Sequence, residues 1–391
     1  MGVKLSSTQY RIVGYFLASS HQTFIHAGET MLEPSQIEQI INDYTDTVAQ
    51  MTLADTKAKI DVKLDGDSVT VAVTLGYPAK AYFDKIQSEL FDLLEDQTEL
   101  KNITVNVDSK ITKHKVQQGV QAIKNIKNII AVASGKGGVG KSTTSVNLAL
   151  ALAAEGAKVG ILDADIYGPS QPRMLGTSQR PESIDGKRIE PIESYGLQSM
   201  SIGFLIDEEE PMIWRGPMVT QALEQMLNDT NWKDLDYLVI DLPPGTGDIQ
   251  LTLSQKVPVS GAVIVTTPQD ISLLDARKAL KMFEKVNVPV MGVVENMSTH
   301  VCSECGHEEH IFGAGGGEKM AKQYGVDLLG DLPLDIQIRE DADQGHPTVV
   351  ADPDGNIAAS YRAIAVRVAA RLAKQGKDYS SAFPNIVIKN D

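Results

Sequence analysis

A glycine-rich segment in the first half of the chain constrains the fold more than any other feature. The apolar run 129–133 leads directly into GKGGVGKST at 135–143, and a helical pattern follows from Val146. This order satisfies G-x-x-x-x-G-K-[ST] between a strand and a helix, where glycines let backbone N–H groups converge on phosphate oxygens. We therefore predict a phosphate-binding loop. The residues expected to bind nucleotide there are Gly135, Lys136, Gly137, Gly138, Val139, Gly140, Lys141, Ser142 and Thr143.

Two lysines of this loop are expected to act on the phosphates. Lys141 supplies a point charge to the β and γ phosphates, and Ser142 is the expected Mg²⁺ ligand. Lys136, directly after the first glycine, gives the loop the form G-K-G-G-x-G-K-[ST], which resembles the deviant Walker A family. That resemblance implies that Lys136 reaches the nucleotide of a second subunit, where a cation supplied in trans stabilises the transferring phosphoryl group. The alternative is a solvated surface lysine.

Buried-looking strands alternate with helical stretches from the loop onward. The alternation predicts an α/β fold with a twisted, mainly parallel sheet and helices on both faces. Ligands of such sheets bind at the carboxyl ends of the strands. The expected strands are Ile129–Ala133, Lys158–Asp163, Leu197–Ile202, Tyr237–Asp241, Gly261–Thr266, Val290–Glu295 and Leu328–Leu332.

Three aspartates are expected at those carboxyl ends. Asp163 and Asp241 each end an apolar strand, where a buried carboxylate is costly unless a cation or hydrogen bonds compensate it. We assign Asp241 to Mg²⁺ and Asp163 to a supporting metal role. Asp165 is the candidate for positioning the attacking water in phosphoryl transfer, which needs orientation and charge neutralisation. The alternative for Asp165 is a helix N-cap. The Gly- and Pro-rich segment after Asp241 is typical of a switch loop that senses the γ-phosphate.

The N-terminal third of the chain has a different pattern of predicted helices and strands. A helical pattern after Glu33 is followed by two strand-like runs around Asp65-Gly66-Asp67, a hairpin signal, then by a second helix and a further strand from Asn102. This predicts a small α+β domain ahead of the nucleotide domain. The expected divisions are an N-terminal extension (1–32), the small domain (33–115), a linker (116–128), the nucleotide domain (129–376) and a tail (377–391).

Charge and cysteine content limit the partners. The 391 residues carry 36 basic and 51 acidic side chains, a net charge of −15. That sign argues against a surface that coats nucleic acid, and no apolar stretch is long enough to span a bilayer as a helix. Two cysteines cannot build a disulfide framework, and their scarcity suits a reducing compartment, which we expect to be the cytoplasm.

Both cysteines fall in one motif, Cys302-Ser303-Glu304-Cys305, in a Gly- and His-rich stretch. Three chemistries remain open. A redox dithiol would open a helix in a βαβ unit. A zinc site could use Cys302 and Cys305 with His307 and His310, or four thiolates from a dimer. Iron–sulfur ligation normally takes four thiolates, which a two-fold symmetric homodimer would supply from two chains. Lys136 and the cysteine pair thus independently indicate a homodimer.

The ordered motifs resemble a known family. The phosphate loop, DADIYGPS at 163–170, DLPPGTGD at 241–248 and CSECGH at 302–307 are similar to those of the Mrp/ApbC iron–sulfur cluster carriers, deviant Walker A ATPases. The resemblance implies an ATP-hydrolysing homodimer that holds a [4Fe–4S] cluster between its cysteine pairs and passes it to apo-proteins. It also implies that Asn296 contacts the adenine and that Pro333 forms part of the base pocket. Residues 33–111 more loosely resemble the small domain that often precedes this ATPase.

Two other functions are compatible with parts of the sequence. A positioning ATPase similar to MinD or ParA would use membrane or DNA association, and the basic amphipathic pattern at Tyr361–Gly376 could support that. The apolar face of this helix is small, so packing on the sheet is the favoured interpretation. A positioning ATPase would also leave the two cysteines without a function. A zinc-stabilised NTPase chaperone is the second alternative.

Overall fold

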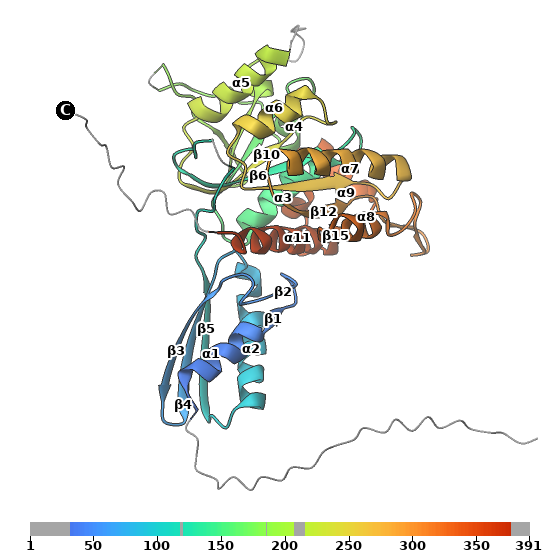
Figure 1. Ribbon diagram of the computed structural model, residues 1–391. Helices are drawn as coiled ribbons and strands as arrows, with labels where there is room; N and C mark the ends of the chain where they lie inside the picture. Colours follow the sequence, from blue (N-terminus) through green and yellow to red (C-terminus); the bar gives the residue numbers. More distant parts are fainter. Residues whose placement is uncertain (1–31, 118–119, 185, 207–215, 377–391) are drawn as a thin grey trace, which may run out of the picture.

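The computed structural model describes residues 32–117, 120–184, 186–206 and 216–376, which form a large α/β part and a smaller α+β part (Figure 1). This confirms the fold class predicted from the sequence. The expected tail 377–391, and the N-terminal extension apart from Leu32, lie outside the described residues. Among the described residues, no helix is long and apolar enough to cross a membrane.

The large part is built on an eight-stranded sheet with the order β15-β12-β11-β6-β10-β7-β9-β8. All neighbouring strands are parallel except β8, which pairs antiparallel with β9. The short strand β8 was not among the strands predicted from the sequence. The strands are β6 (Ile126–Ala133), β7 (Val159–Asp163), β8 (Ile192–Ser194), β9 (Leu197–Ser201), β10 (Leu235–Asp241), β11 (Gly261–Thr266), β12 (Val290–Glu295) and β15 (Leu328–Asp331).

Strand β6 begins at Ile126, inside the segment expected to be a linker. Its second and third residues, Lys127 and Asn128, are polar, so the local pattern did not indicate a strand there. The Lys127 ammonium lies 2.6 Å from an Asp236 carboxylate oxygen, and the Asn128 amide donates to the carbonyls of Thr112 and Asp236. These partners on β10 and on the preceding chain satisfy polar groups that periodicity alone would place in a loop.

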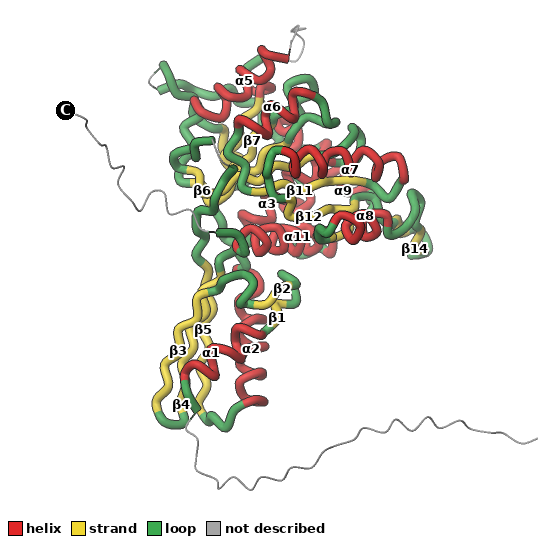
Figure 2. Tube along the Cα trace, in the orientation of Figure 1, coloured by secondary structure: helices red, strands yellow, loops and turns green. Residues whose placement is uncertain are grey.

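Helices cover both faces of the sheet (Figures 1 and 2). One face packs against α3 (Lys141–Ala154), α10 (Thr348–Ala351) and α11 (Asn356–Ala373), and the other against α5 (Gly216–Asp229), α6 (Asp248–Lys256), α7 (Asp270–Lys285) and α8 (Gly316–Tyr324). The short helices α4 (Gln171–Met174), η2 (Ile202–Phe204) and α9 (Ile336–Asp343) lie at connections. Apolar side chains of the strands and of the covering helices form two cores, one on each side of the sheet.

The small part is a three-stranded sheet with helices. The predicted hairpin is present as antiparallel β3 and β4 around Gly66, while β5 pairs parallel to β4 because α2 makes the crossover. Its elements are α1 (Pro34–Asp43), β1 (Thr45–Asp46), β2 (Met51–Thr52), β3 (Lys59–Asp65), β4 (Ser68–Leu75), η1 (Lys80–Tyr82), α2 (Phe83–Gln97) and β5 (Asn102–Ser109).

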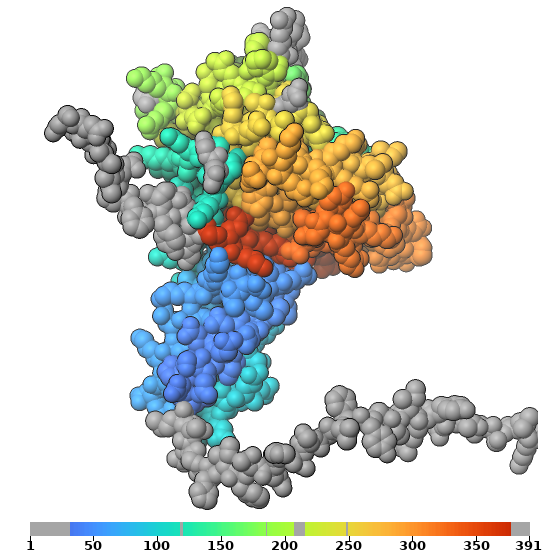
Figure 3. All heavy atoms as spheres, in the orientation of Figure 1, coloured from blue at the N-terminus to red at the C-terminus, as the bar shows by residue number. Residues whose placement is uncertain are grey.

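Helix α11 joins the two parts, as Figure 3 shows where the small part packs against it. Its apolar side chains are buried, so the prediction that this helix packs on the sheet is confirmed. Its basic side also has partners. Arg367 donates to the carbonyls of Val48 and Leu329, and Arg371 donates to the Ala49 carbonyl. The basic pattern that suggested a membrane helix therefore anchors the small part, whose core is continuous with one face of the sheet.

The far end of the phosphate-loop helix also touches the small part. Glu155, directly after α3, is almost fully buried. Its carboxylate accepts a hydrogen bond of 2.9 Å from the Ala81 N–H, and its backbone carbonyl accepts one from the Lys80 N–H. Burial raises the pKa of Glu155 above its ordinary value of 4.5, although the Ala81 N–H and the nearby Arg362 oppose this shift.

Because the pKa of Glu155 is higher in the folded state, the folded chain is stabilised by protonation. The stability linked to this group is fully present below pH 4.5 and is lost as the pH rises through the folded pKa. In Glu155→Gln the side-chain amide keeps an oxygen that accepts from the Ala81 N–H, but it does not ionise. We therefore expect this variant not to lose stability as the pH rises through the pKa of Glu155. Urea unfolding as a function of pH should show the variant gaining stability relative to wild type from pH 4.5 to neutrality.

The matched control is Glu38→Gln, at an exposed glutamate of α1, which should leave stability unchanged. A constant difference between Glu155→Gln and wild type at every pH would contradict the burial effect.

Candidate nucleotide and cysteine sites

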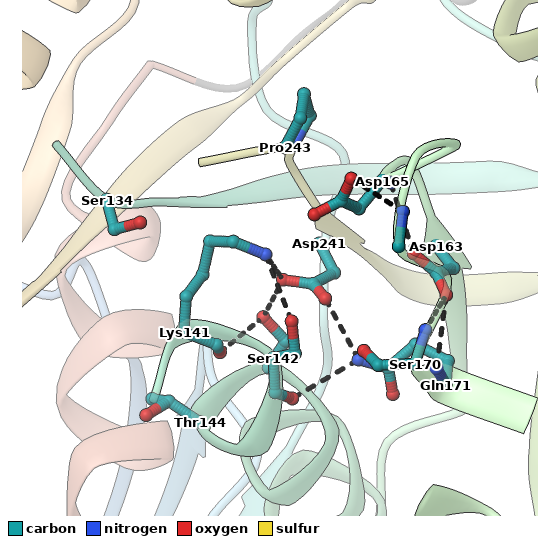
Figure 4. A network of polar contacts seen from close by, with 12 residues as sticks. Ser134, Lys141, Ser142, Thr144, Asp163, Asp165, Ser170, Gln171, Asp241 and Pro243 are labelled. Carbon is teal, nitrogen blue, oxygen red and sulfur yellow. Dashed lines mark hydrogen bonds and ion pairs between the residues drawn. The ribbon is translucent and has the colours of Figure 1, made fainter. Parts of the chain in front are cut away.

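The carboxyl ends of three adjacent strands meet at one place on the sheet edge. Strand β10 lies between β6 and β7, and Asp241 at its end is in register with Asp163 at the end of β7. The phosphate loop follows β6 on the other side. Figure 4 shows the Lys141 ammonium pointing at Asp241, with Asp163 and Asp165 beyond it. The parallel topology therefore brings together three motifs that are far apart in the sequence.

The loop has the backbone that its glycines require. Gly138 and Gly140 have φ angles of +79° and +80°, which disfavour any other residue. Gly135 approaches α7 so closely that a Cβ there would lie 2.0 Å from the Asp275 carbonyl carbon. The loop ends at the N-terminus of α3, where free N–H groups favour an anion. This geometry fits a bound phosphate chain.

A buried ion pair lies at the centre of the site. The Lys141 ammonium is 2.5 Å from Asp241 Oδ1, and the two side chains are only 6% and 0% exposed. Asp241 also accepts hydrogen bonds from the Ser145 hydroxyl (2.8 Å) and the Gln171 amide (3.0 Å). The Lys141 ammonium further contacts the Ser142 hydroxyl at 3.1 Å. The proposed phosphate-binding lysine is thus held by the carboxylate assigned to the metal.

Asp163 serves mainly to hold the loop that follows it. Its carboxylate accepts from the N–H groups of Asp165, Ser170 and Gln171 and from the Ser201 hydroxyl. Burial and the adjacent charge of Asp241 raise the pKa of Asp163 to about 7. Two buried carboxylates this close repel one another, so the donor set suits a divalent cation nearby.

Asp165 lies in the loop after β7, close to Asp241 and on its far side from the phosphate loop (Figure 4). It is half-buried, and its carboxylate accepts from the Gly168 N–H at 3.3 Å. Burial raises its pKa, while Lys141 lowers it and Asp241 raises it further. Helix α4 begins at Gln171 with Ser170 as its N-cap residue, so Asp165 is not a helix cap. Its closeness to both charged groups fits the expected role beside the γ-phosphate.

Lys136 is half-exposed at the start of the loop. Its backbone carbonyl accepts from the Ser134 hydroxyl at 2.9 Å. Within the described ranges, its ammonium makes no ion pair or hydrogen bond. The charge of Lys136 is therefore free for a ligand or a second chain.

Asn296 and Pro333 lie on the other side of the loop. The Asn296 amide donates to the Val139 carbonyl at 2.9 Å and leaves no room for a side chain at Gly140. Backbone hydrogen bonds join Leu332 to Glu295 and Ser298, which places Pro333 beside Asn296. Asn296 thus contacts the phosphate loop in this structure, and its contact with the adenine remains a prediction.

The two cysteines lie in a short hairpin after Asn296. Strands β13 (His300–Val301) and β14 (Glu308–Glu309) flank a turn in which the Cys302 N–H donates to the His307 carbonyl and the Gly306 N–H donates to the Cys302 carbonyl. Both thiols are free, and Cys305 is exposed. The pKa of Cys302 is lowered, first by the Cys305 N–H and then by the Glu304 N–H. The turn therefore favours a thiolate, the form that binds metal.

A single-chain zinc site is not assembled here. The described residues contain no group of three or more His, Cys, Asp or Glu side chains placed to hold a metal ion. One ring nitrogen of His310 is hydrogen-bonded to the Ser298 carbonyl, and one of His300 to the Leu334 carbonyl. In the described residues, Cys302, Cys305, His307 and His310 are not grouped as the four ligands of a zinc site.

Sequence reasoning missed two residues that contact Asp241. Ser145 lies one helical turn after Lys141, and that spacing was a usable signal. Gln171 gave no signal, because only the folded loop after Asp163 brings it to Asp241.

Comparison with known families identifies the two parts. Residues 125–369 match the family model described as NUBPL iron-transfer P-loop NTPase, which is more than half of the chain. The chain belongs to this NTPase family. Residues 34–107 match the model of an iron–sulfur cluster assembly protein. The family resemblance predicted from the ordered motifs is confirmed, and the nucleotide-binding P-loop fold is established.

Similar proteins cover more than half of the chain, and one covers most of it. An iron–sulfur cluster carrier protein of Haemophilus influenzae is 52% identical over 90% of this chain and 96% of its own length. The mouse iron–sulfur cluster transfer protein NUBPL is 53% identical over 64% of this chain and 79% of its own. A nucleotide-binding protein from Archaeoglobus fulgidus, solved with ADP, is 38% identical with a TM-score of 0.52, covering 59% of this chain and 90% of that one.

The buried pair allows a test of the nucleotide-free state. Lys141→Ala leaves Asp241 buried without its cation, so we expect it to lower the free energy of unfolding by about 3 kcal/mol. Adding Asp241→Asn should recover part of that loss, because the amide carries no charge. Urea unfolding of the two single variants and the double variant measures the coupling.

Lys127→Ala is the matched control, since its ion pair with Asp236 is of similar length but Lys127 is 41% exposed. Lys127→Ala should lower the free energy of unfolding by less than about 1 kcal/mol. Equal losses for Lys127→Ala and Lys141→Ala would show that burial of the pair contributes nothing.

Proposed function

We propose that this protein is an ATP-dependent iron–sulfur cluster carrier. A homodimer holds a [4Fe–4S] cluster through Cys302 and Cys305 of both chains and passes it to apo-proteins. The observation that carries the proposal is the pair of free thiols in one hairpin, where the described residues group no third His, Cys, Asp or Glu side chain with them to hold a metal ion. A second copy supplies the missing half of a four-thiolate site. The names of the similar proteins support the same cargo.

ATP binds with its phosphates on residues 135–143, at the N-terminus of α3. Lys141 leaves Asp241 for the β and γ phosphates, and Ser142 and Asp241 would hold Mg²⁺, with Asp163 in support. When bound, the metal ion would neutralise charge on the phosphoryl group. Asp165 orients the attacking water, because its carboxylate lies beside both Lys141 and Asp241. Lys136 stabilises the transferring phosphoryl group of the partner's nucleotide, which couples hydrolysis to dimer formation.

Residues 296–302 connect the two sites. Asn296 contacts the phosphate loop at Val139, and the same stretch continues into the cysteine hairpin. A change in the loop when nucleotide binds or leaves therefore acts on the Cys302 hairpin through the hydrogen bond from Asn296 to Val139 and the short stretch of chain that follows Asn296. We infer that nucleotide turnover alters cluster retention in this way.

The remaining assignments follow from this chemistry. Free thiols and a labile cluster require a reducing compartment, which we propose to be the cytoplasm. The small domain contains no cysteine, so docking of apo-protein recipients is its proposed role. A positioning ATPase is disfavoured because the basic side of α11 is used in holding the small domain. We propose no nucleic-acid or membrane partner.

Replacing either cysteine should abolish cluster retention. We expect Cys302→Ser and Cys305→Ser, reconstituted anaerobically, to lose nearly all iron and sulfide per dimer, because one missing thiolate per chain removes two ligands. Ser303→Ala, in the same turn, is the matched control and should keep both. All three should bind ATP as the wild type does. Normal iron and sulfide content in the cysteine variants, or zinc in place of iron in the wild type, would contradict the proposal that Cys302 and Cys305 bind an iron–sulfur cluster.

Lys136→Ala tests the contribution from the partner subunit. We expect ATP hydrolysis to fall by about 10³-fold, the scale of a cation supplied in trans, while ATP binding is retained. Steady-state phosphate release and nucleotide binding separate the two effects. Mixing Lys136→Ala with an excess of Lys141→Ala should restore some turnover, since a mixed dimer contains one intact site with a partner lysine. Full turnover by Lys136→Ala alone would remove this role.

A further inference from the structure

Gln171 contacts three residues of the nucleotide site at once. It is the first residue of α4 and is fully buried. Its side-chain amide donates to Asp241 Oδ2 at 3.0 Å and to the Ser142 carbonyl at 3.2 Å, and its backbone N–H donates to Asp163 Oδ2 at 3.1 Å. Figure 4 shows Gln171 between the start of α3 and the two aspartates. Both protons of its amide nitrogen are therefore used at the site.

The two oxygens of Asp241 have different donors. Oδ1 receives the Lys141 ammonium and the Ser145 hydroxyl, whereas Oδ2 receives Gln171. Ser145 has a single proton, which it divides between Asp241 and the Lys141 carbonyl. Once Lys141 turns to the phosphates, Gln171 is the donor that continues to fix the Asp241 carboxylate. An amide is uncharged, so it orients the carboxylate without neutralising it for a cation.

A purely structural role explains this residue poorly. Within the described part of the chain, Gln171 Oε1 is buried and has no hydrogen-bond partner. Leaving such an oxygen without a hydrogen bond destabilises the fold, and Met or Leu of similar size would not carry that penalty. The amide is thus placed for its donors, which point at the metal-binding carboxylate and at the backbone of the metal-binding serine.

We propose that Gln171 is a positioning residue for the Mg²⁺–nucleotide site, whose amide holds Asp241 and the Ser142 backbone in the arrangement that binds the metal. This inference rests on the proposed nucleotide function. It assigns Gln171 no contact with the nucleotide or the metal, so its removal should affect the contribution of Mg²⁺ and not the phosphate loop itself.

The test measures binding of a fluorescent ATP analogue in Mg²⁺ and in EDTA, without relying on turnover. Removing a group that orients a metal ligand typically costs 10–100-fold in metal affinity. For Gln171→Met we expect the Mg²⁺ concentration at half-maximal effect to rise about tenfold or more, with binding in EDTA unchanged. Gln117→Met is the matched control, because the Gln117 amide also donates two hydrogen bonds, to the carbonyls of Ser254 and Val257, away from the site.

Each outcome decides the inference. Unchanged Mg²⁺ dependence in Gln171→Met would overturn it and leave the proposed function intact. An equal loss of binding in Mg²⁺ and EDTA would also overturn it, since that is what general damage to the loop produces. No effect of Mg²⁺ on the wild type would overturn the proposed nucleotide function as well. If Gln171→Met does not fold by circular dichroism, Gln171→Asn, which shortens the amide by one methylene, is judged by the same two conditions.

Discussion

The buried pair of Lys141 and Asp241 is the interaction around which the site is organised, because neither charge is tolerated in the sheet without the other. It joins the phosphate loop after β6 to the end of β10, and Gln171 and Ser145 join the same carboxylate to α4 and α3. In the proposed function, nucleotide binding takes the Lys141 cation away from Asp241 and a divalent ion replaces it. The pair seen without nucleotide then marks where the charges of the phosphates and the metal ion are compensated.

The helix whose N-terminus is proposed to receive the phosphates contacts the small domain at its other end. Glu155 after α3 accepts from the backbone of Ala81, and α11 presents Arg367 and Arg371 to the carbonyls of Val48 and Ala49. Backbone groups of the small domain are thus bonded to the two helices that cover one face of the sheet. This arrangement connects the domain proposed to receive partners with the helix that carries Lys141.

Much of the fold could be predicted from local patterns. The core strands after the phosphate loop were found because they are continuous apolar runs, and the hairpin around Gly66 was found from its turn residues. The start of β6 and the whole of β8 were not, because Lys127 and Asn128 are polar and β8 is short. Their place in the sheet depends on pairing with β10 and β9, contacts that no local periodicity records.

The sequence alone determined the chemical identity of the sites. Glycines, lysines and aspartates at fixed spacings predict a phosphate loop and a metal site, and two cysteines in one motif predict half of a ligand set. Tertiary structure decided how these groups act on one another: which carboxylate holds Lys141, that Gln171 joins three of them, and that the basic side of α11 has partners within the chain. The reason is physical. Chemistry belongs to residue types, which the sequence lists directly, whereas burial, pairing and pKa depend on neighbours that only the folded sheet brings together.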